Sequence, residues 1–290
     1  MMLNFKTTFL VLAISLVSGV TMAQSADLTM KWKPDHEYTI RQNLDFNMTM
    51  PNPRGGGDIA TKMNMVMGMN GPSSIDEKGI LVEMEFDTIT MNMNMSGKQI
   101  MNYDSTKPNP DGAIDKAMAP LLEIKFQTLY GKDGKFIGLE DFDEKLFDPK
   151  LGLSKKSLES IMKQQSQMIP HREVKVGEVW KATLITPMQG FEGGLSCNYD
   201  FKLAAINEVK GKQIARIQFT ADMEDMKMNQ NGVEMTMSAK NIDGYYLFDV
   251  KEGQFTESKV FFDMVAKVQD AEMLMQMNMT IDFGHSPLKK

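Results

Sequence analysis

Methionine recurs at every second position in several segments of this 290-residue chain, which holds 29 Met. The runs are Met63, Met65, Met67 and Met69; Met91, Met93 and Met95; Met226 and Met228; Met235 and Met237; and Met273, Met275, Met277 and Met279. Successive side chains of a strand point to opposite faces, so this period places each run on one face of a β-strand. The sequence therefore predicts sheets with a soft thioether surface on one side.

Other apolar residues share these predicted faces. Phe86 follows Met84, Phe219 follows Ile217, and Phe283 continues the last Met run at the same spacing. The alternate positions are polar, namely Asn64, Asn92, Asn94, Gln276, Asn278 and Asp282. We therefore expect the Met faces to point inward and the alternate faces to meet solvent.

Short segments recur in the same order along the chain and predict an internal duplication. The matched pairs are 32–38 with 174–180, 82–86 with 215–219, and 133–136 with 252–255. We interpret the chain as a signal peptide at 1–23, a first β repeat at 24–150, a helical connection at 151–172 and a second β repeat at 173–290. Both repeats are expected to form one compact unit.

The apolar face changes parity at matching places in the two repeats. Even-numbered residues up to Phe86 are apolar, and odd-numbered residues take over from Ile89; in the second repeat the switch falls between Met223 and Met226. A slip of one residue turns every side chain to the other face, so a bulge or bend is needed to keep one face inside. Two long strands bent in this way predict a strongly curved sheet.

Helix is predicted at 153–168, where Leu158, Ile161 and Met168 share a stripe at helical spacing before Pro170, and over a shorter stretch at 114–122. The predicted fold class is mainly β. We expect internally duplicated antiparallel curved sheets, forming a half-barrel or incomplete barrel, with one main α-helix packed between or against them.

The N-terminus has the features of a secretory signal peptide. Lys6 supplies positive charge, residues 9–17 supply a short apolar segment, and cleavage is expected after Ala23. This predicts an exported protein, periplasmic or secreted. The apolar segment is too short to span a bilayer and no other segment approaches its apolar length, so no membrane span is predicted in the mature chain.

Charge and reactive residues exclude several functions. The net charge of −6 argues against a nucleic-acid partner, and the single Cys197 leaves the fold to rest on packing. The three His residues have neither metal-ligand spacing nor a catalytic context. The sequence therefore predicts a protein that is not an enzyme and has no cofactor, catalytic residue or metal site.

A set of ordered motifs covers nearly the whole mature chain. Residues 103–108 read Tyr-Asp-Ser-Thr-Lys-Pro, Gly134-Lys135 lies in a predicted hairpin, and residues 174–180 read Val-Lys-Val-Gly-Glu-Val-Trp. With the Met strands and residues 32–38, these segments resemble an uncharacterised family of exported bacterial proteins, a domain of unknown function. The chain has Pro34-Asp35 where Gly is usual in that family. The resemblance implies a β-rich fold, similar to the lipoprotein-carrier and half-barrel lipid-binding families, and it assigns no catalytic residues.

The function expected from these features is to bind or carry an apolar, lipid-like ligand in a Met-lined β cavity. Met side chains are deformable, which suits a cavity that admits a flexible acyl chain. The predicted ligand-binding face comprises Met63, Met65, Met67, Met84, Phe86, Met91, Met93, Met95, Phe219, Met226, Met228, Met273, Met275, Met277 and Met279.

Two alternatives remain open. In the first, the Met faces are plain core and the protein is a structural module of the envelope that binds a protein partner through a sheet edge. In the second, the thioethers bind Cu(I). Residues on one strand face lie about 6.5–7 Å apart, so a metal site needs ligands from neighbouring strands.

Overall fold

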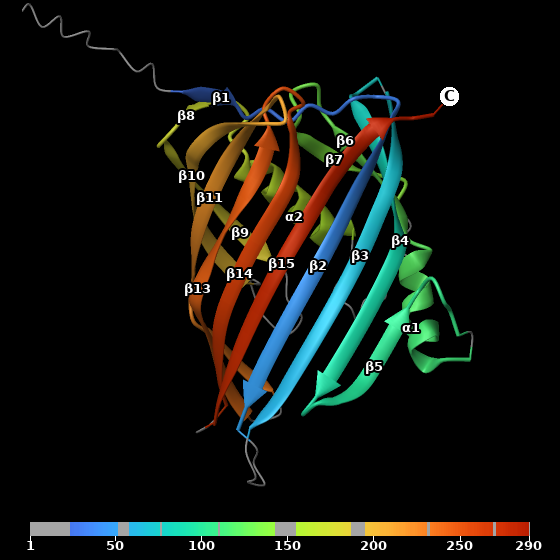
Figure 1. The fold of residues 1–290 in the computed structure, drawn as a ribbon, viewed down its shortest axis with the longest axis vertical. Helices are drawn as coiled ribbons and strands as arrows, with labels where there is room; N and C mark the ends of the chain where they lie inside the picture. Colours follow the sequence, from blue (N-terminus) through green and yellow to red (C-terminus); the bar gives the residue numbers. More distant parts are fainter. Residues whose placement is uncertain are drawn as a thin grey trace, which may run out of the picture.

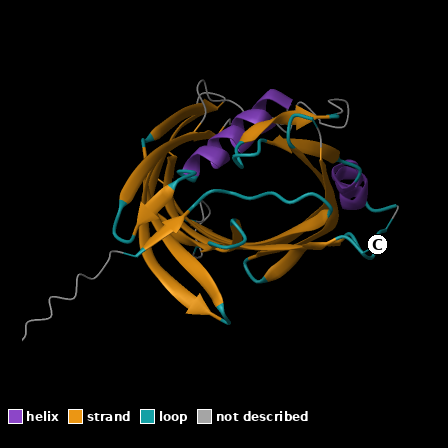
Figure 2. Cartoon of the chain, turned by 90° about the horizontal axis from the view of Figure 1, so that it is seen from above, coloured by secondary structure: helices purple, strands orange, loops and turns teal. Residues whose placement is uncertain are grey.

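The computed structural model describes residues 24–51, 58–75, 77–109, 111–142, 155–186, 195–230, 233–268 and 271–289. Its strands form a 13-stranded antiparallel sheet and a separate pair made by β1 (Ser25–Asp27) and β8 (Glu173–Lys175). The large sheet curves strongly without closing into a barrel (Figures 1 and 2). The predicted fold class, mainly β with antiparallel curved sheets, is confirmed.

The order of the sheet is β7-β6-β4-β3-β2-β15-β14-β13-β11-β10-β9, with β5 beside β4 and β12 beside β13. The strands are β2 (His36–Met50), β3 (Ile59–Ile75), β4 (Ile80–Met95), β5 (Lys98–Asp104), β6 (Lys125–Tyr130), β7 (Phe136–Glu140), β9 (Val179–Thr186), β10 (Leu195–Val209), β11 (Lys212–Met223), β12 (Met226–Gln230), β13 (Val233–Asp249), β14 (Gln254–Val268) and β15 (Ala271–Pro287). In the described ranges the helices are α1 (Ala113–Leu122) and α2 (Lys155–Met168), where the sequence predicts helix.

The two halves of the sheet follow the same strand order. The series β7-β6-β4-β3-β2 recurs as β14-β13-β11-β10-β9, and β15 joins the two series between β14 and β2. Matched turns also share a left-handed backbone, with φ of 56° at Asp35 and 91° at Gly177, and 78° at Gly134 and 66° at Gly253. A duplicated unit would produce this order, and the division into repeats itself stays a prediction.

The predicted switches in face parity occur where they were expected. On β4, Gly68 of β3 pairs with Thr88 and Met69 with Phe86, so Asp87 is the extra residue of a bulge. In the second half the chain breaks between β11 and β12, and β12 pairs with β13 alone. The bulge and the chain break each return the apolar side chains to one face as the sheet curves.

Helix α2 lies across the opening between the two edge strands, β7 and β9 (Figure 2). Beneath it, Met168 packs into a cluster with Phe201, Phe219 and Val260, which are nearly fully buried. Leu158 packs against a second cluster, which contains Tyr38. Because α2 covers the concave side, the sheet face that carries these residues is the inner face.

The segment from residue 28 to residue 35 crosses one end of the curved sheet and joins both halves (Figure 2). Its backbone donates hydrogen bonds from Leu28 to Arg172 (3.0 Å) and from Lys31 to Gly253 (2.9 Å). Trp32 stacks on Tyr130 with a ring separation of 4.0 Å. We call this segment, residues 28–35, the strap, and it covers the end of the sheet that holds the aromatic clusters.

Candidate ligand-binding face

The register of the sheet aligns the predicted Met residues into rows that cross six strands on the inner face. Three adjacent rows contain most of them. From β14 to β5 the rows read Met264, Met275, Met48, Thr61 and Met95; Phe262, Met277, Phe46, Met63, Met93 and Met101; and Val260, Met279, Leu44, Met65, Met91 and Tyr103. We call these the methionine rows. They lie on the face that α2 covers elsewhere, since Val260 and Met279 also belong to the cluster beneath α2.

Neighbouring positions extend this surface on both sides. Met67 follows in the next row, between Gln42 and Ile89. Met273 pairs with Ala266, and Met226 pairs with Met237. The structure therefore brings residues from both ends of the chain to one inner face, through the pairing of β15 with β2.

Burial divides the predicted face into two parts. Met84 (6% exposed), Phe86 and Phe219 belong to the clusters near α2 and act as core there. In the methionine rows, by contrast, every Met is half-buried except Met95, which is 41% exposed. Met67, Met273 and the buried Met226 complete the predicted set, and the side chain of Met228 lies outside the described residues.

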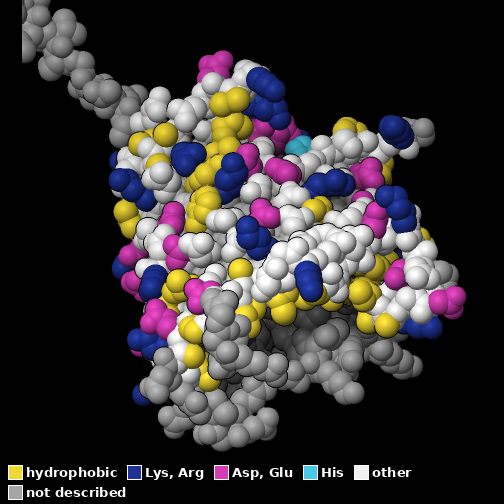
Figure 3. Space-filling view, turned by 60° about the horizontal axis from the view of Figure 1, so that its bottom comes forward, with side chains coloured by type: hydrophobic (Ala, Val, Ile, Leu, Met, Phe, Trp, Pro, Cys, Tyr) yellow, Lys and Arg dark blue, Asp and Glu magenta, His cyan; other side chains and the backbone are white. Residues whose placement is uncertain are grey.

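The half-buried rows lie toward the end of the sheet opposite the strap. Figure 3 views the molecule with this end forward, and hydrophobic side chains gather there along the rim of a hollow. One polar contact is built into the inner face, where Gln42 Nε2 donates to the sulfur of Met279 at 3.1 Å. The surface is thus apolar, polarizable and partly open.

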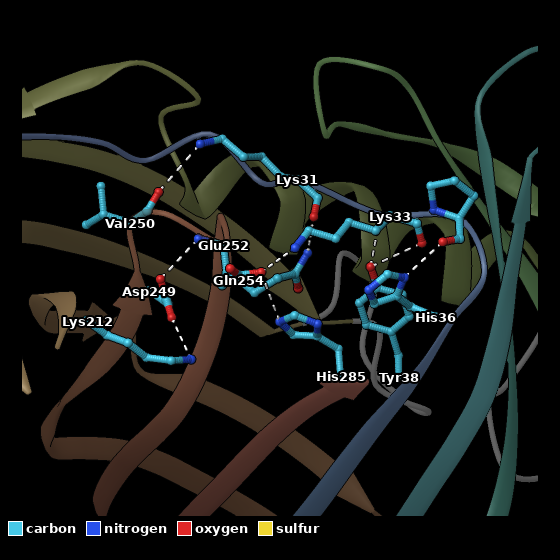
Figure 4. Close-up of polar contacts among 11 residues, drawn as sticks. Lys31, Lys33, His36, Tyr38, Lys212, Asp249, Val250, Glu252, Gln254 and His285 are labelled. Atoms are coloured by element: carbon cyan, nitrogen blue, oxygen red, sulfur yellow. Dashed lines mark hydrogen bonds and ion pairs between the residues drawn. The ribbon is translucent and has the colours of Figure 1, made fainter. Parts of the chain in front are cut away.

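A polar network closes the strap end (Figure 4). Lys33 of the strap forms an ion pair with Glu252, and His285 Nε2 lies 3.8 Å from the Glu252 carboxylate. Nearby, Lys212 Nζ lies 3.0 Å from Asp249, whose side chain is only 2% exposed. Gln254 Nε2 donates to the carbonyl of Lys31 at 2.7 Å, which fixes the strap to β14.

The electrostatics of this network favour charged carboxylates and a neutral imidazole. The hydrogen bond from Lys33 holds the pKa of Glu252 below its usual value. Burial opposes ionisation of Asp249, but bonds from the Glu252 amide and Lys212 outweigh it and lower the pKa. Burial, and then the charge of Lys33, lower the pKa of His285. The network can therefore lock the strap in place near neutral pH.

Side chains of α2 form hydrogen bonds with backbone groups of both edge strands, β7 and β9. The Gln164 amide donates to the carbonyl of Ile185 on β9 (3.0 Å) and accepts from its N–H. On β7, the N–H of Phe136 donates to Ser166 Oγ (3.2 Å). Helix α2 thus covers edge groups that would otherwise be free to pair with another strand.

Two cavities among the described residues lie mostly outside the methionine rows, since only Met91 and Tyr103 of the rows line one of them. One, of about 560 Å³, is lined by residues of β3, β4, β5 and α1 and of the segment between β5 and α1. It is lined by Asn64, Thr90, Met91, Asn92, Asn102, Tyr103, Asp104, Lys107, Asn109 and Asp115. The other, of about 370 Å³, includes Arg41, Asp87 and Asp282. The first is lined mainly by polar residues together with Met91 and Tyr103, and the second combines its charged residues with Ile40, Met69 and Phe283.

The remaining predicted features are placed as follows. Cys197 is buried, and burial raises the pKa of its thiol, which therefore stays protonated. No group of three or more His, Cys, Asp or Glu in the described ranges is arranged to hold a metal ion. Among the same residues no helix has the length and apolar character to cross a membrane. The predicted signal peptide, residues 1–23, lies outside the described residues.

Sequence reasoning missed the pairing of two histidines. The rings of His36 and His285 lie 5.9 Å apart, on β2 and β15. Nothing in the sequence signals this contact, because it depends on which strands from opposite ends of the chain become neighbours.

No family model matches the chain, and no curated protein matches it. Among solved structures, it shares 8% identity with DynF from the dynemicin biosynthesis pathway of Micromonospora chersina, covering 89% of this chain and 85% of that one, with a TM-score of 0.19. A protein of Bacteroides fragilis with a YmcC-like fold gives 8% identity, coverage of 84% and 98%, and a TM-score of 0.17. Both TM-scores are too low to carry an argument about fold or function, so the resemblance described from the sequence stays a prediction.

Proposed function

We propose that this protein binds and carries an apolar, chain-like ligand against the methionine rows. The observation that carries the proposal is the partial exposure of these side chains on a concave face. Phe201 and Ile217, on the same face near α2, are 1% and 0% exposed. A surface that served only as core would be buried to the same degree, and a large apolar surface left open favours an occupant.

The chemistry of the rows supports a flexible ligand. Met is unbranched and adapts its shape to what it touches, and the rows also include the rings of Phe46 and Phe262. On these strands the outer face carries Asn64, Asn92 and Asn278 at the alternate positions, and its exposed apolar residues Phe261 and Leu274 form no comparable rows. The strap covers the opposite end of the sheet, and α2 covers the opening between β7 and β9.

The proposal includes export, with cleavage near Ala23. N-terminal sequencing of protein recovered from the periplasm or medium of a bacterial host tests this directly. A mature chain beginning near Gln24 supports export, and an intact Met1 in the cytoplasm contradicts it.

Ligand binding is tested on the full chain purified without detergent, by organic extraction with mass spectrometry and by titration with a fluorescent fatty acid. The critical variant is Met65→Lys, and its matched control is Val66→Lys, the next residue on β3, which points to the outer face. We expect Met65→Lys to weaken fatty-acid binding by about tenfold or more, because it places a charge against the acyl chain. Val66→Lys should bind like the unaltered protein. Equal binding by both variants, or no binding by the unaltered protein, would overturn the proposal.

Binding of a protein partner through a sheet edge is the less favoured function. The edge groups at Phe136 and Ile185 are already bonded to side chains of α2. A partner that binds through the edges should be blocked by substitutions in β7 or β9, and Met65→Lys should leave it unaffected.

A further inference from the structure

The register places Met residues of three neighbouring strands opposite one another. Met93 on β4 lies directly opposite Met63 on β3 and also opposite Met101 on β5. In the adjacent row, Met91 lies opposite Met65. Five Met thus occupy one block of the inner face, and we call them the sulfur block.

We infer that the sulfur block is a binding site for a soft monovalent metal ion, Cu(I) or Ag(I). A single strand separates residues on one face by about 6.5–7 Å, which is too far for one strand to supply several ligands to an ion. Side chains directly opposite on neighbouring strands have Cβ atoms only about 4.5–5.5 Å apart. The cross-strand row of Met63, Met93 and Met101 therefore meets the condition that a single Met run does not.

The reach of the side chains fits three-sulfur coordination. The outer two strands of the row are roughly 10 Å apart, twice the spacing of neighbouring strands. A Met sulfur lies two bonds beyond Cβ on a flexible chain, and the concave curvature tilts the side chains of the row toward one another. Met63 and Met101 can therefore bring their sulfurs toward that of Met93 without movement of the backbone.

The surroundings suit a soft cation. Thioethers prefer Cu(I) over harder ions. All five Met of the block are half-buried, so an ion can reach them. Met91 also lines the 560 Å³ cavity together with the carboxylates of Asp104 and Asp115. Asp104 is paired there with Lys107, so the attraction of a cation to a site whose own ligands are neutral rests mainly on the net charge of −6.

Apolar ligand binding alone does not require sulfur in this block. Elsewhere on the same face, Leu44, Ile89 and Ile281 occupy equivalent inward positions. Met-to-Leu substitution therefore separates the two roles, because Leu preserves volume and apolar character and removes the ligand atom.

The test is titration of the full chain with Ag(I), and with Cu(I) under anaerobic reducing conditions against a chromophoric Cu(I) chelator. Native mass spectrometry measures stoichiometry, and X-ray absorption identifies the ligand atoms. The block variants are Met93→Leu and, separately, Met63→Leu with Met101→Leu. The control is Met277→Leu, which lies in the same row on β15 beyond Phe46. Zn(II) serves as the harder ion.

We expect a sulfur-ligated adduct in the unaltered protein and in Met277→Leu, its loss in both block variants, and no Zn(II) adduct. The inference is overturned if the unaltered protein forms no Ag(I) or Cu(I) adduct, or if the block variants bind as well as the control. If the unaltered protein binds the metal ion but no fatty acid, the proposed carrier function alone is overturned. The two failures are therefore distinguishable.

Discussion

At the scale of single residues, close approaches of the backbone decide which side chains the sheet tolerates. Gly71 on β3 is the sharpest case, because a Cβ built there would lie 1.7 Å from the carbonyl oxygen of Glu83 on the neighbouring strand. Gly138 on β7, by contrast, has no atom within 4 Å of the same position. The backbone cannot move aside as the end of a side chain can. Glycine is therefore required at position 71 by the packing of the neighbouring strand and not by its φ angle.

Gly71→Ala should lower the free energy of unfolding by about 3 kcal/mol, in the upper range for overpacking, because β3 and β4 must separate. Gly138→Ala should change it by less than about 1 kcal/mol. Urea denaturation followed by circular dichroism measures both. Equal effects would show that the close approach at Gly71 is relieved by rotation of the strand.

The lowered pKa of His285 predicts a pH dependence of stability. In the unfolded chain the imidazole of His285 titrates at about pH 6.5. In the folded protein it takes up its proton only at lower pH. The contribution of His285 to stability is therefore complete above about pH 6.5 and falls as the pH drops below it. His171, whose pKa burial also lowers, adds to the same fall. His285→Gln should flatten the dependence of the unfolding free energy between about pH 7 and pH 5. An unchanged slope would contradict this role of His285.

At the scale of elements, α2 replaces the strand pairing that an open sheet lacks. Gln164 both donates to and accepts from the backbone of Ile185, as a paired strand would. Trp180 Nε1 also donates to the carbonyl of Met168 (2.8 Å), so β9 holds the C-terminal end of the helix as well. These bonds, with Leu158 and Met168 packed beneath, explain why the helix lies across the opening.

Gln164→Met should destabilise the protein by about 0.5–1.5 kcal/mol, because it keeps the apolar stem and exchanges two hydrogen bonds of the exposed Ile185 backbone for bonds to water. Gln164→Glu retains the acceptor and should cost less. Hydrogen exchange should show faster exchange of the Ile185 amide in Gln164→Met. Unaltered exchange at Ile185 would mean that this contact does not protect the edge.

At the scale of the whole molecule, the continuous sheet couples the two halves. β15 pairs with β14 on one side and with β2 on the other, and the strap reaches turns in both halves. The chain has two Trp, of which Trp32 packs against the core cluster that contains Tyr38 and Trp180 packs against the cluster beneath α2 that contains Phe201. Each half therefore carries its own fluorescent reporter.

We expect the described halves to unfold in a single transition. In Trp32→Phe and in Trp180→Phe, the fluorescence and circular dichroism midpoints in urea should coincide within each variant, since neither half can lose its pairing at β15 alone. A fluorescence midpoint well separated from the circular dichroism midpoint in either variant would show that the halves unfold independently.

Several features followed from the sequence because they depend on local chemistry. The period of two in the Met runs identified strands and separated their faces, the segment at Gly134-Lys135 formed the turn between β6 and β7, and the stripe ending at Met168 formed α2. The change of parity between Phe86 and Ile89 located a bulge, because one face must stay inside. Periodicity and turn geometry are properties of neighbouring residues, so a sequence displays them directly.

The tertiary structure decided which of these faces meet. Pairing of β15 with β2 joined Met runs from opposite ends of the chain, and the register set Met93 opposite Met63 and Met101. The tertiary structure also divided the predicted ligand-binding face into two parts. Met84 and Phe219 are buried in the core, whereas Met65 is only half-buried. Strand neighbours and burial depend on contacts between distant segments, whose choice is settled by the packing of the whole sheet. The sequence by itself determined the faces, and only the fold determined what each face encloses.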